Sequence, residues 1–359
     1  MIFDFNNFKD INIYGLNKAD KKQLFLKALY KLTSYHIKKC KEYNTIFKSF
    51  GNKTKKFLNM KDVPFLSTRI FKSFELKSTS RKNIIKTLNS SGTTGQKTSK
   101  IVLDKINASN QVKVLNKIVS NVLGKKRLPM IIIDSEAVLK NKSKISARSA
   151  AINGFSIFGY DHIFLLDNNM QIDVVRLKNF LEKHNNEKIF IFGFTSILWN
   201  YFCEPLKNQD IKLNLENCLL IHGGGWKKLH SKNINNKKLK RYLKNKLNLH
   251  KIFNYYGMVE QTGSIFLECE KCECFVTSVF SDIIIRDSDL SVCKNGKEGI
   301  VQLLSLLPSS YPGHSILTDD IGVIKGEDNC KCKKLGKYFQ IKKRVEKSDL
   351  RGCSDTFNT

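Results

Sequence analysis

Hydrophobic positions along the chain recur with two different spacings. Between about residues 17 and 50 they return at roughly helical intervals with lysines between them, which predicts helical structure. Pro64 interrupts this pattern, and a stretch without clear periodicity follows. The pattern therefore predicts an N-terminal helical segment over residues 1–80.

Short apolar runs rich in β-branched residues dominate the middle of the chain. The amphipathic stretch 174–184 between two of them has helical spacing. The strand-like runs are residues 128–135, 161–167, 188–196, 218–226 and 250–258. Strands separated by helical stretches indicate an α/β architecture with a largely parallel sheet. We therefore expect an α/β core over residues 81–275.

The pattern changes again after about residue 275. Short apolar runs alternate with turns, and helical spacing is not evident. This predicts a β-rich subdomain over residues 276–345, followed by a short tail over residues 346–359. The lysine-rich stretch 227–251 within the core is most simply a solvated helix with a loop.

Composition narrows the class of protein. Hydrophobic residues make up 41% of the chain, enough to bury a core, and the formal net charge is +30. Of the 62 basic residues only nine are Arg, whereas specific nucleic-acid contacts favour arginine forks. Lys and Asn are enriched along the whole chain, as in a general compositional bias, so we expect no nucleic-acid partner.

Targeting signals are not evident in the sequence. No apolar run is long enough to span a bilayer, and "MIFDFNNFKD" at the N-terminus lacks a signal-peptide core. We expect a cytoplasmic protein without a transmembrane segment, whose ten cysteines are mostly reduced.

Two cysteine pairs have the spacing of metal ligands. Cys269 and Cys272 form a C-x-x-C pair, and Cys330 and Cys332 form a C-x-C pair. Four thiolates of this kind can bind a structural Zn²⁺ tetrahedrally, with Cys274 as a substitute ligand. Reduced surface thiols without metal are the alternative interpretation.

The segment "TLNSSGTTGQKTSK" concentrates small hydroxyl residues, glycines and lysines. Glycines let the backbone turn and present its amides, and the hydroxyls and lysines add donors and charge. The residues concerned are Ser90, Ser91, Gly92, Thr93, Thr94, Gly95, Lys97 and Lys100. They suit a phosphate-binding loop, although the Walker pattern G-x-x-x-x-G-K-[ST] is absent. Alone, an ordinary Ser/Gly surface loop explains them equally well.

This loop resembles the phosphate loop of adenylate-forming enzymes, and further segments resemble later motifs of that superfamily in order. "HGGGW" is similar to the glycine turn beside the adenine, and "NYYGMVEQTG" to the motif Y-G-x-T-E, with Val259 at the usual Thr. "LTDDIG" is similar to T-G-D, with Asp319 at the usual Gly, and "KKRVEKSDLRG" resembles the hinge segment.

The whole pattern resembles the acyl-protein synthetase (LuxE) family. "VPFLSTRIFK", "SSGTTGQ", "GFTSILW", "SLLPSSYPGHSILTDDIG" and "RGCSDTF" carry this likeness. It implies the large N-terminal domain of adenylate-forming enzymes, with doubly wound sheets and a β-rich subdomain. The short stretch after Gly352 implies that the usual C-terminal lid domain is largely missing.

The resemblance also implies an activity. Such enzymes use ATP and Mg²⁺ to convert a carboxylic acid, here a fatty acid, into an acyl-adenylate, and pass the acyl group to a protein cysteine as a thioester. A partner protein such as an acyl reductase or acyl acceptor is expected. Two alternatives remain open: an acyl-CoA ligase whose lid another chain supplies, and a basic binding module without chemistry.

The resemblance assigns roles to individual residues. Ser90 to Gly95 would hold phosphates, with Lys97 or Lys100 nearby, and Glu260 would hold Mg²⁺. Gly223, Gly224, Gly225, Tyr256 and Gly257 would surround the adenine. Asp320 would accept the ribose hydroxyls, with Arg344 supporting it, and Cys353 would accept the acyl group. The aromatic stretch "IFGFTSILWNYF" is expected either to border the acid or to pack in the core.

Overall fold

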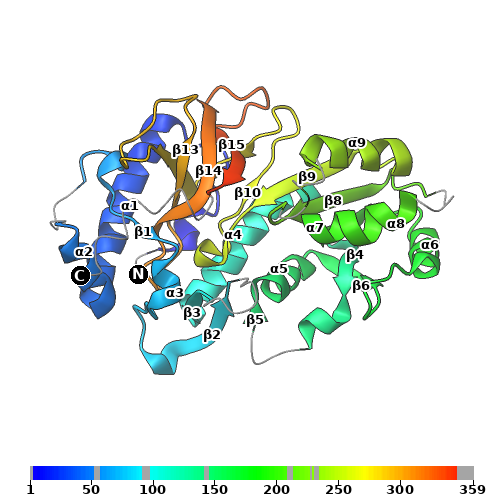
Figure 1. Cartoon of the computed structure of the whole chain (residues 1–359), viewed down its shortest axis with the longest axis horizontal. Helices are drawn as coiled ribbons and strands as arrows, with labels where there is room; N and C mark the ends of the chain where they lie inside the picture. Colours follow the sequence, from blue (N-terminus) through cyan, green and yellow to red (C-terminus); the bar gives the residue numbers. More distant parts are fainter. Residues whose placement is uncertain are drawn as a thin grey trace. The chain divides into compact units, whose positions relative to one another are not determined.

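The computed structural model describes residues 3–51, 57–90, 98–140, 145–207, 213–226, 229 and 234–345. The chain forms two compact units, each assembled from separate stretches of sequence (Figure 1). The first unit, called unit 1, comprises Met1–Thr87, Gly92–Val114 and Glu260–Thr359. The second, unit 2, comprises Leu88–Ser91 and Leu115–Val259.

A parallel sheet forms the centre of unit 2. The strands of this sheet that belong to unit 2, in spatial order, are β9 (Lys251–Tyr256), β8 (Cys218–Gly223), β7 (Ile189–Phe194), β4 (Leu128–Ser135) and β6 (Gly159–Leu166). Every neighbouring pair among these five is parallel. Strands covered on both faces need apolar residues at nearly every position, which explains the unbroken apolar runs of the sequence.

Helices cover both faces of this sheet. Alternate strand residues point to opposite faces, so Ile131 and Ile191 belong to a core shared with the helical elements on one side. On the other side Phe192 stacks on Phe155 at a ring distance of 4.3 Å. The helical elements of the first side are α6 (Val174–Lys183), the π-helix η5 (Leu198–Cys203), α8 (Glu204–Lys207) and α9 (Asn236–Leu247), and Phe155 comes from α5 (Ala147–Ser156).

An antiparallel sheet forms the centre of unit 1. Its strands, in spatial order, are β11 (Phe275–Val276), β15 (Lys337–Arg344), β14 (Ser315–Glu327), β13 (Gly299–Ser305) and β12 (Ser281–Arg286). The short strand β1 (Leu66–Ser67) adds to β14 in parallel. The chain from β11 onward is therefore rich in β-strands, as its pattern of short apolar runs separated by turns predicts.

The predicted N-terminal helical region resolves into two helices, α1 (Lys18–Lys39) and α2 (Lys41–Ser49). The side chain of Asn17 accepts a hydrogen bond from Asp20 N and caps α1. Cys40, at φ −123° and ψ 107°, takes an extended conformation that separates the two helices. Hydrophobic periodicity continues through this single residue, so the pattern did not reveal the break.

The remaining elements are short or connect the sheets. The other strands are β2 (Ile84–Asn89), β3 (Lys100–Asp104), β5 (Ile145–Ser146) and β10 (Phe266–Leu267). The other α-helices are α3 (Ile70–Ser73), α4 (Lys105–Leu123) and α7 (Thr195–Ile197). The 3-10 helices are η1 (Phe5–Phe8), η2 (Met60–Asp62), η3 (Arg81–Asn83), η4 (Glu136–Leu139) and η7 (Val259–Gln261).

Among the helices in the described part of the chain, none has both the length and the apolar character that crossing a bilayer would require.

Candidate functional site

The predicted site residues are divided between the two units. In unit 2 the glycine turn follows the carboxyl end of β8. Phe194 and Tyr255 of the neighbouring strands both lie in register with Gly223. The carboxyl edge of a parallel sheet is where open α/β folds bind ligands. The turn and Tyr256, the last residue of β9, therefore occupy an edge suited to binding.

Close packing explains Gly223, and backbone conformation explains Gly224. A Cβ at Gly223 would lie 2.2 Å from the ring of Tyr255, and Gly224 has φ +87°, where side chains are strained. Gly224 and Gly225 are exposed, as is Gly257 after β9, while Tyr256 is half-buried. The turn thus brings bare backbone to the surface.

Thr195 and His222 fix the start of the turn, and sequence reasoning missed both as supporting residues. Thr195 Oγ1 lies 2.9 Å from His222 Nδ1 and donates a hydrogen bond to Gly223 O at 3.1 Å. Burial lowers the pKa of His222 to about 3, so its imidazole is neutral at neutral pH. Both residues stand in segments that carry the family likeness, "GFTS" and "HGGGW", which was the available signal.

In unit 1, Glu260 is held in a buried 3-10 helix. Glu260 is only 5% exposed to solvent. The hydroxyl of Tyr311 donates a hydrogen bond to Glu260 O at 2.8 Å. The side-chain Nε2 of the next residue, Gln261, donates hydrogen bonds to Leu303 O and Gly313 O. A Cβ at Gly313 would lie 2.7 Å from Glu260 O. The segment around Tyr311 and Gly313 therefore fixes the backbone that carries this carboxylate.

The electrostatics around Glu260 favour a cation. Burial raises the pKa of its carboxyl, while the nearby Ser99 hydroxyl and the positive charges of Lys72 and Arg344 lower it in part. The raised pKa shows that these partners do not fully compensate for desolvation. A hard divalent cation prefers carboxylate oxygens and would supply the missing charge, so the residues present fit Mg²⁺.

Asp319, which precedes the predicted ribose-binding residue Asp320, forms two ion pairs with arginines. Arg344 is in register with Asp320 across β14 and β15, yet its Nη2 lies 3.9 Å from Asp319 Oδ2. Arg69 Nε lies 3.4 Å from Asp319 Oδ1. The ladder shifts register at Ile321, and such irregularities redirect side chains.

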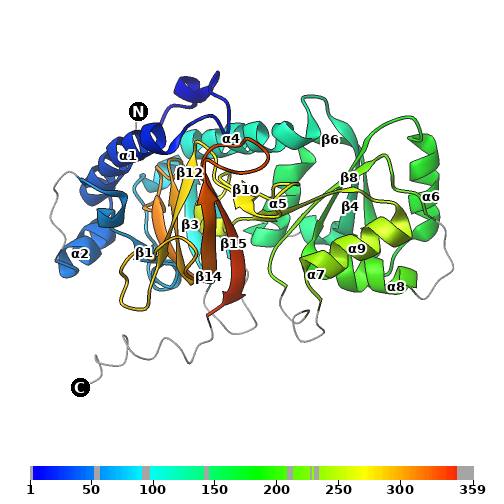
Figure 2. The same ribbon diagram turned by 90° about the horizontal axis from the view of Figure 1, so that it is seen from above.

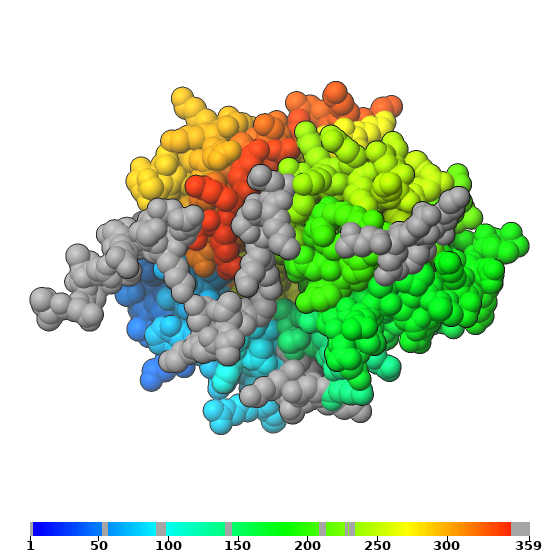
Figure 3. Space-filling model, turned by 45° about the vertical axis from the view of Figure 1, so that its right-hand side comes forward, coloured from blue at the N-terminus to red at the C-terminus, as the bar shows by residue number. Residues whose placement is uncertain are grey.

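Sequence reasoning missed Arg69 and Asp319 as members of this group. The signal was present, because "VPFLSTRIFK" contains Arg69 and Lys72, and Asp319 replaces a family glycine. Arg344 is 74% exposed, so water screens its charge and its ion pair is weak. The orange-to-red surface of β14 and β15 is partly visible in Figure 3.

The phosphate-loop prediction is only partly within the described residues. Ser90 is half-buried directly after β2, and Lys100 is the exposed first residue of β3. Ser91, Gly92, Thr93, Thr94, Gly95 and Lys97 lie outside the described residues, as does Cys353 in the C-terminal tail. The roles of all these residues stay predictions.

The cysteines of the metal prediction come together in unit 1. The sulfurs of Cys269, Cys330 and Cys332 all lie within 4.8 Å of one another, and Cys272 Sγ lies 3.4 Å from Cys330 Sγ.

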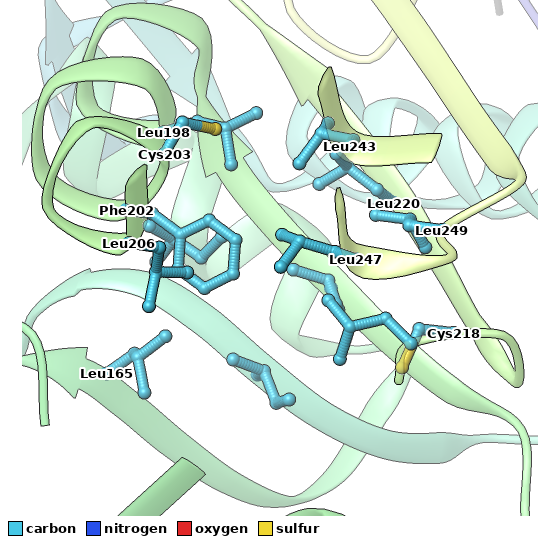
Figure 4. Close-up of a cluster of buried hydrophobic side chains, with 14 of the residues drawn as sticks. Leu165, Leu198, Phe202, Cys203, Leu206, Cys218, Leu220, Leu243, Leu247 and Leu249 are labelled. Atoms are coloured by element: carbon cyan, nitrogen blue, oxygen red, sulfur yellow. The ribbon is translucent and has the colours of Figure 1, made fainter. Parts of the chain in front are cut away.

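The aromatic stretch after β7 packs in the core of unit 2. Trp199 and Phe202 are both buried there, and Phe202 lies among leucine side chains (Figure 4).

Comparison with known proteins identifies the fold and family. The model of the acyl-protein synthetase (LuxE) family matches residues 8–359. No curated protein sequence matches the chain significantly.

Solved structures similar to this chain include 2-hydroxyisobutyryl-CoA ligase in complex with 2-HIB-AMP, at TM-score 0.71 and 12% identity, covering 92% of this chain and 69% of that one. The same ligase in an open conformation with 2-HIB-AMP and CoA gives TM-score 0.69 and 12% identity, covering 92% and 75%. ATP-bound MatB from Rhodopseudomonas palustris gives TM-score 0.50 and 12% identity, covering 74% and 49%.

Identities this low show a common fold, and they confirm the predicted α/β class with the doubly wound sheet. The family match spans nearly the whole chain and agrees with that fold. The chain therefore belongs to the acyl-protein synthetase (LuxE) family.

Proposed function

We propose that this protein activates a carboxylic acid with ATP and then transfers the acyl group to a cysteine thiol. In the first step a carboxylate oxygen forms a bond to the α-phosphorus of ATP as the bond to pyrophosphate breaks. In the second step a thiolate attacks the acyl carbonyl, and AMP leaves as the thioester forms. Family membership supports this reaction, and a long-chain fatty acid is the acid we propose.

The observation that best supports the first step is the charge arrangement in unit 1. Glu260 is a buried carboxylate under the influence of Lys72 and Arg344, and Asp319 pairs with both Arg69 and Arg344. A buried acid with incomplete compensation suits a metal ion, and the positive side chains near Glu260 and Asp319 suit a polyanionic substrate. Stabilising charge in this way supplies most of the catalysis in nucleotidyl transfer.

Within this proposal the residues have separate tasks. Glu260 would hold Mg²⁺, which, when bound with ATP, offsets the negative charge of the phosphates. Asp320 would accept hydrogen bonds from the ribose, and Ser90 to Gly95 would donate to phosphate oxygens, with Lys97 or Lys100 adding charge. Gly223 to Gly225, Tyr256 and Gly257 would border the adenine. Lys72 and Arg69 join Arg344 as additional positive groups.

The acceptor in the second step is proposed to be Cys353. A thiolate is the required nucleophile, and neighbouring Arg351 favours that form. Coenzyme A is the competing acceptor, because one of the similar solved structures is a ligase with CoA bound.

The two steps can be tested separately. The full-length protein should catalyse ATP–pyrophosphate exchange that depends on a carboxylic acid, measured with fatty acids of graded chain length. Absence of exchange with every acid, in folded protein with Mg²⁺, would argue for a binding module instead. For the second step, radioactive acid should label the protein in a hydroxylamine-sensitive bond without added CoA. Cys353→Ser should lose this label and keep exchange; if label appears only on added CoA, the CoA-ligase alternative replaces our proposal.

A further inference from the structure

Two loops of unit 1, distant in sequence, place cysteines against one another. The first loop joins β10 to β11 and carries Cys269 and Cys272; the second joins β14 to β15 and carries Cys330 and Cys332. Cys330 Sγ lies 3.7 Å from Cys269 Sγ, 3.4 Å from Cys272 Sγ and 2.9 Å from Cys332 Sγ. We propose that these four thiolates bind one structural Zn²⁺.

The sulfur distances suit one tetrahedral ion. Four sulfurs at about 2.3 Å from a common Zn²⁺ lie about 3.8 Å from one another. The contact between Cys269 and Cys330 is close to that value. A tetrahedral site would need Cys332 to move away from Cys330, and Cys272, which contacts Cys330, to move closer to the rest of the group. A disulfide would need sulfurs about 2.05 Å apart. All four thiols are free.

Both loops are already closed by backbone hydrogen bonds. In the first, Cys269 N donates to Cys274 O and Glu273 N donates to Cys269 O, with Glu273 at φ +51°. In the second, Lys333 N donates to Cys330 O, with Lys333 at φ +61°. Such tight turns bring two sulfurs of one loop to the same side, so a metal would meet ligands that need little rearrangement.

Backbone amides also point at the sulfurs. The backbone N–H groups of Lys271 and Cys272 lie near the Cys269 sulfur, and that of Lys334 lies near the Cys332 sulfur. Amide donors stabilise sulfur that carries negative charge, and orienting groups of this kind support metal ligands. Metal binding would release four protons, one from each thiol, as four Zn–S bonds form.

The resulting centre would carry a net charge of −2, which needs compensation. The two loops supply it, because Lys271, Lys331, Lys333 and Lys334 lie within them. Lys334 also lies over the ring of Tyr14, with Nζ 4.6 Å from the ring centroid. Cys274, the substitute ligand, is directed differently: its thiol donates to Cys272 O at 3.2 Å.

The ion would join two segments separated by about sixty residues of chain. The second loop is the tip of the β14–β15 hairpin, whose strands carry Asp319, Asp320 and Arg344 (Figure 2). Closing so long a loop removes conformational freedom from the unfolded chain, so zinc should stabilise this hairpin and its register.

The test is metal analysis of full-length protein purified with a thiol reductant and without chelator. We expect about one Zn²⁺ per chain, and after exchange with Co²⁺ the visible absorption bands of a tetrahedral thiolate site. Hydrogen exchange of the loop over residues 328–336 should slow when zinc is present. Folded wild-type protein that contains no zinc and takes up none from solution would overturn the proposal.

Variants locate the ligands. Cys272→Ser and Cys332→Ser should each lower zinc content at least about tenfold and change the cobalt spectrum. The matched controls Cys274→Ser and Cys293→Ser, which remove other cysteines of the same unit, should keep full zinc content. Loss of zinc in Cys274→Ser with retention in Cys272→Ser would overturn the assignment of the four ligands.

Discussion

At the residue scale, Glu260 is the group whose chemistry depends most on its surroundings. It is nearly inaccessible to water, and the positive charges near it come from Lys72 and the exposed Arg344. A buried acid of this kind is costly to ionise unless a cation joins it. Binding of a metal and the charge of this carboxyl should therefore depend on each other.

Replacing Glu260 with Gln should lower acid-dependent ATP–pyrophosphate exchange by about 10²-fold or more, because a contact that stabilises charge is lost. Glu298→Gln, which changes an exposed acid of the same unit, is the matched control and should exchange normally. Initial exchange rates at saturating ATP and Mg²⁺ provide the measurement. Equal rates in both variants would remove Glu260 from the proposed reaction.

The raised pKa of Glu260 also predicts a pH dependence of stability. The folded state favours the protonated carboxyl, so this residue's contribution is fully present at low pH and is lost as pH rises through its raised pKa. Without nucleotide or Mg²⁺, the unfolding temperature of Glu260→Gln relative to wild type should therefore increase from acidic to neutral pH. A difference that stays constant with pH would contradict the burial argument.

At the scale of elements, the strand ends are positioned by close packing that leaves no room for side chains. Gly223→Ala would bring a Cβ into the Tyr255 ring, and overpacking of this kind costs about 1–3 kcal/mol. Gly154→Ala in helix α5 is the control and should be tolerated, because its nearest contact is a flexible leucine at 3.3 Å. Urea denaturation of the two variants measures the difference in their free energies of unfolding. Equal midpoints would show that β9 can shift to accommodate the added methyl group at little cost.

Two stacked histidines join helix α1 to the segment that supports η7. His36 and His314 have ring centroids 5.0 Å apart; His36 Nδ1 lies 2.7 Å from Ser78 Oγ, and His314 Nε2 lies 2.9 Å from Thr33 Oγ1. Burial lowers the pKa of His36 to about 3 and that of His314 well below its usual value. Both rings are therefore neutral in the folded protein near neutral pH.

A histidine with a depressed pKa stabilises the fold above its unfolded pKa, and this contribution is lost as pH falls. The free energy of unfolding should decrease between about pH 6.5 and pH 4, and His36→Gln should flatten this decrease while lowering stability at neutral pH. Denaturant titrations at several pH values test this. An unchanged slope in the variant would assign the acid sensitivity to other groups.

At the scale of the whole molecule, the net charge of +30 is the dominant electrostatic feature. It should produce binding to any polyanion at low salt without sequence preference, because counterion release drives such binding. Affinity for random DNA should therefore fall about 10³-fold or more between roughly 0.05 M and 0.2 M NaCl. Fluorescence anisotropy with two unrelated DNA sequences tests this, and tight, selective binding at the higher salt would overturn our expectation of no nucleic-acid partner.

The amino-acid sequence by itself determined the α/β class, the parallel strands and the β-rich region, because their periodicities reflect local burial. Ordered motifs also singled out Glu260, Asp320 and Arg344, and metal-ligand spacing singled out the cysteine pairs. Only the tertiary structure decided that Arg344 pairs with Asp319, that Arg69 joins them, and that Cys330 contacts both Cys269 and Cys272. These contacts depend on strand register and on closing loops between distant segments, and neither leaves a periodic signal in the chain.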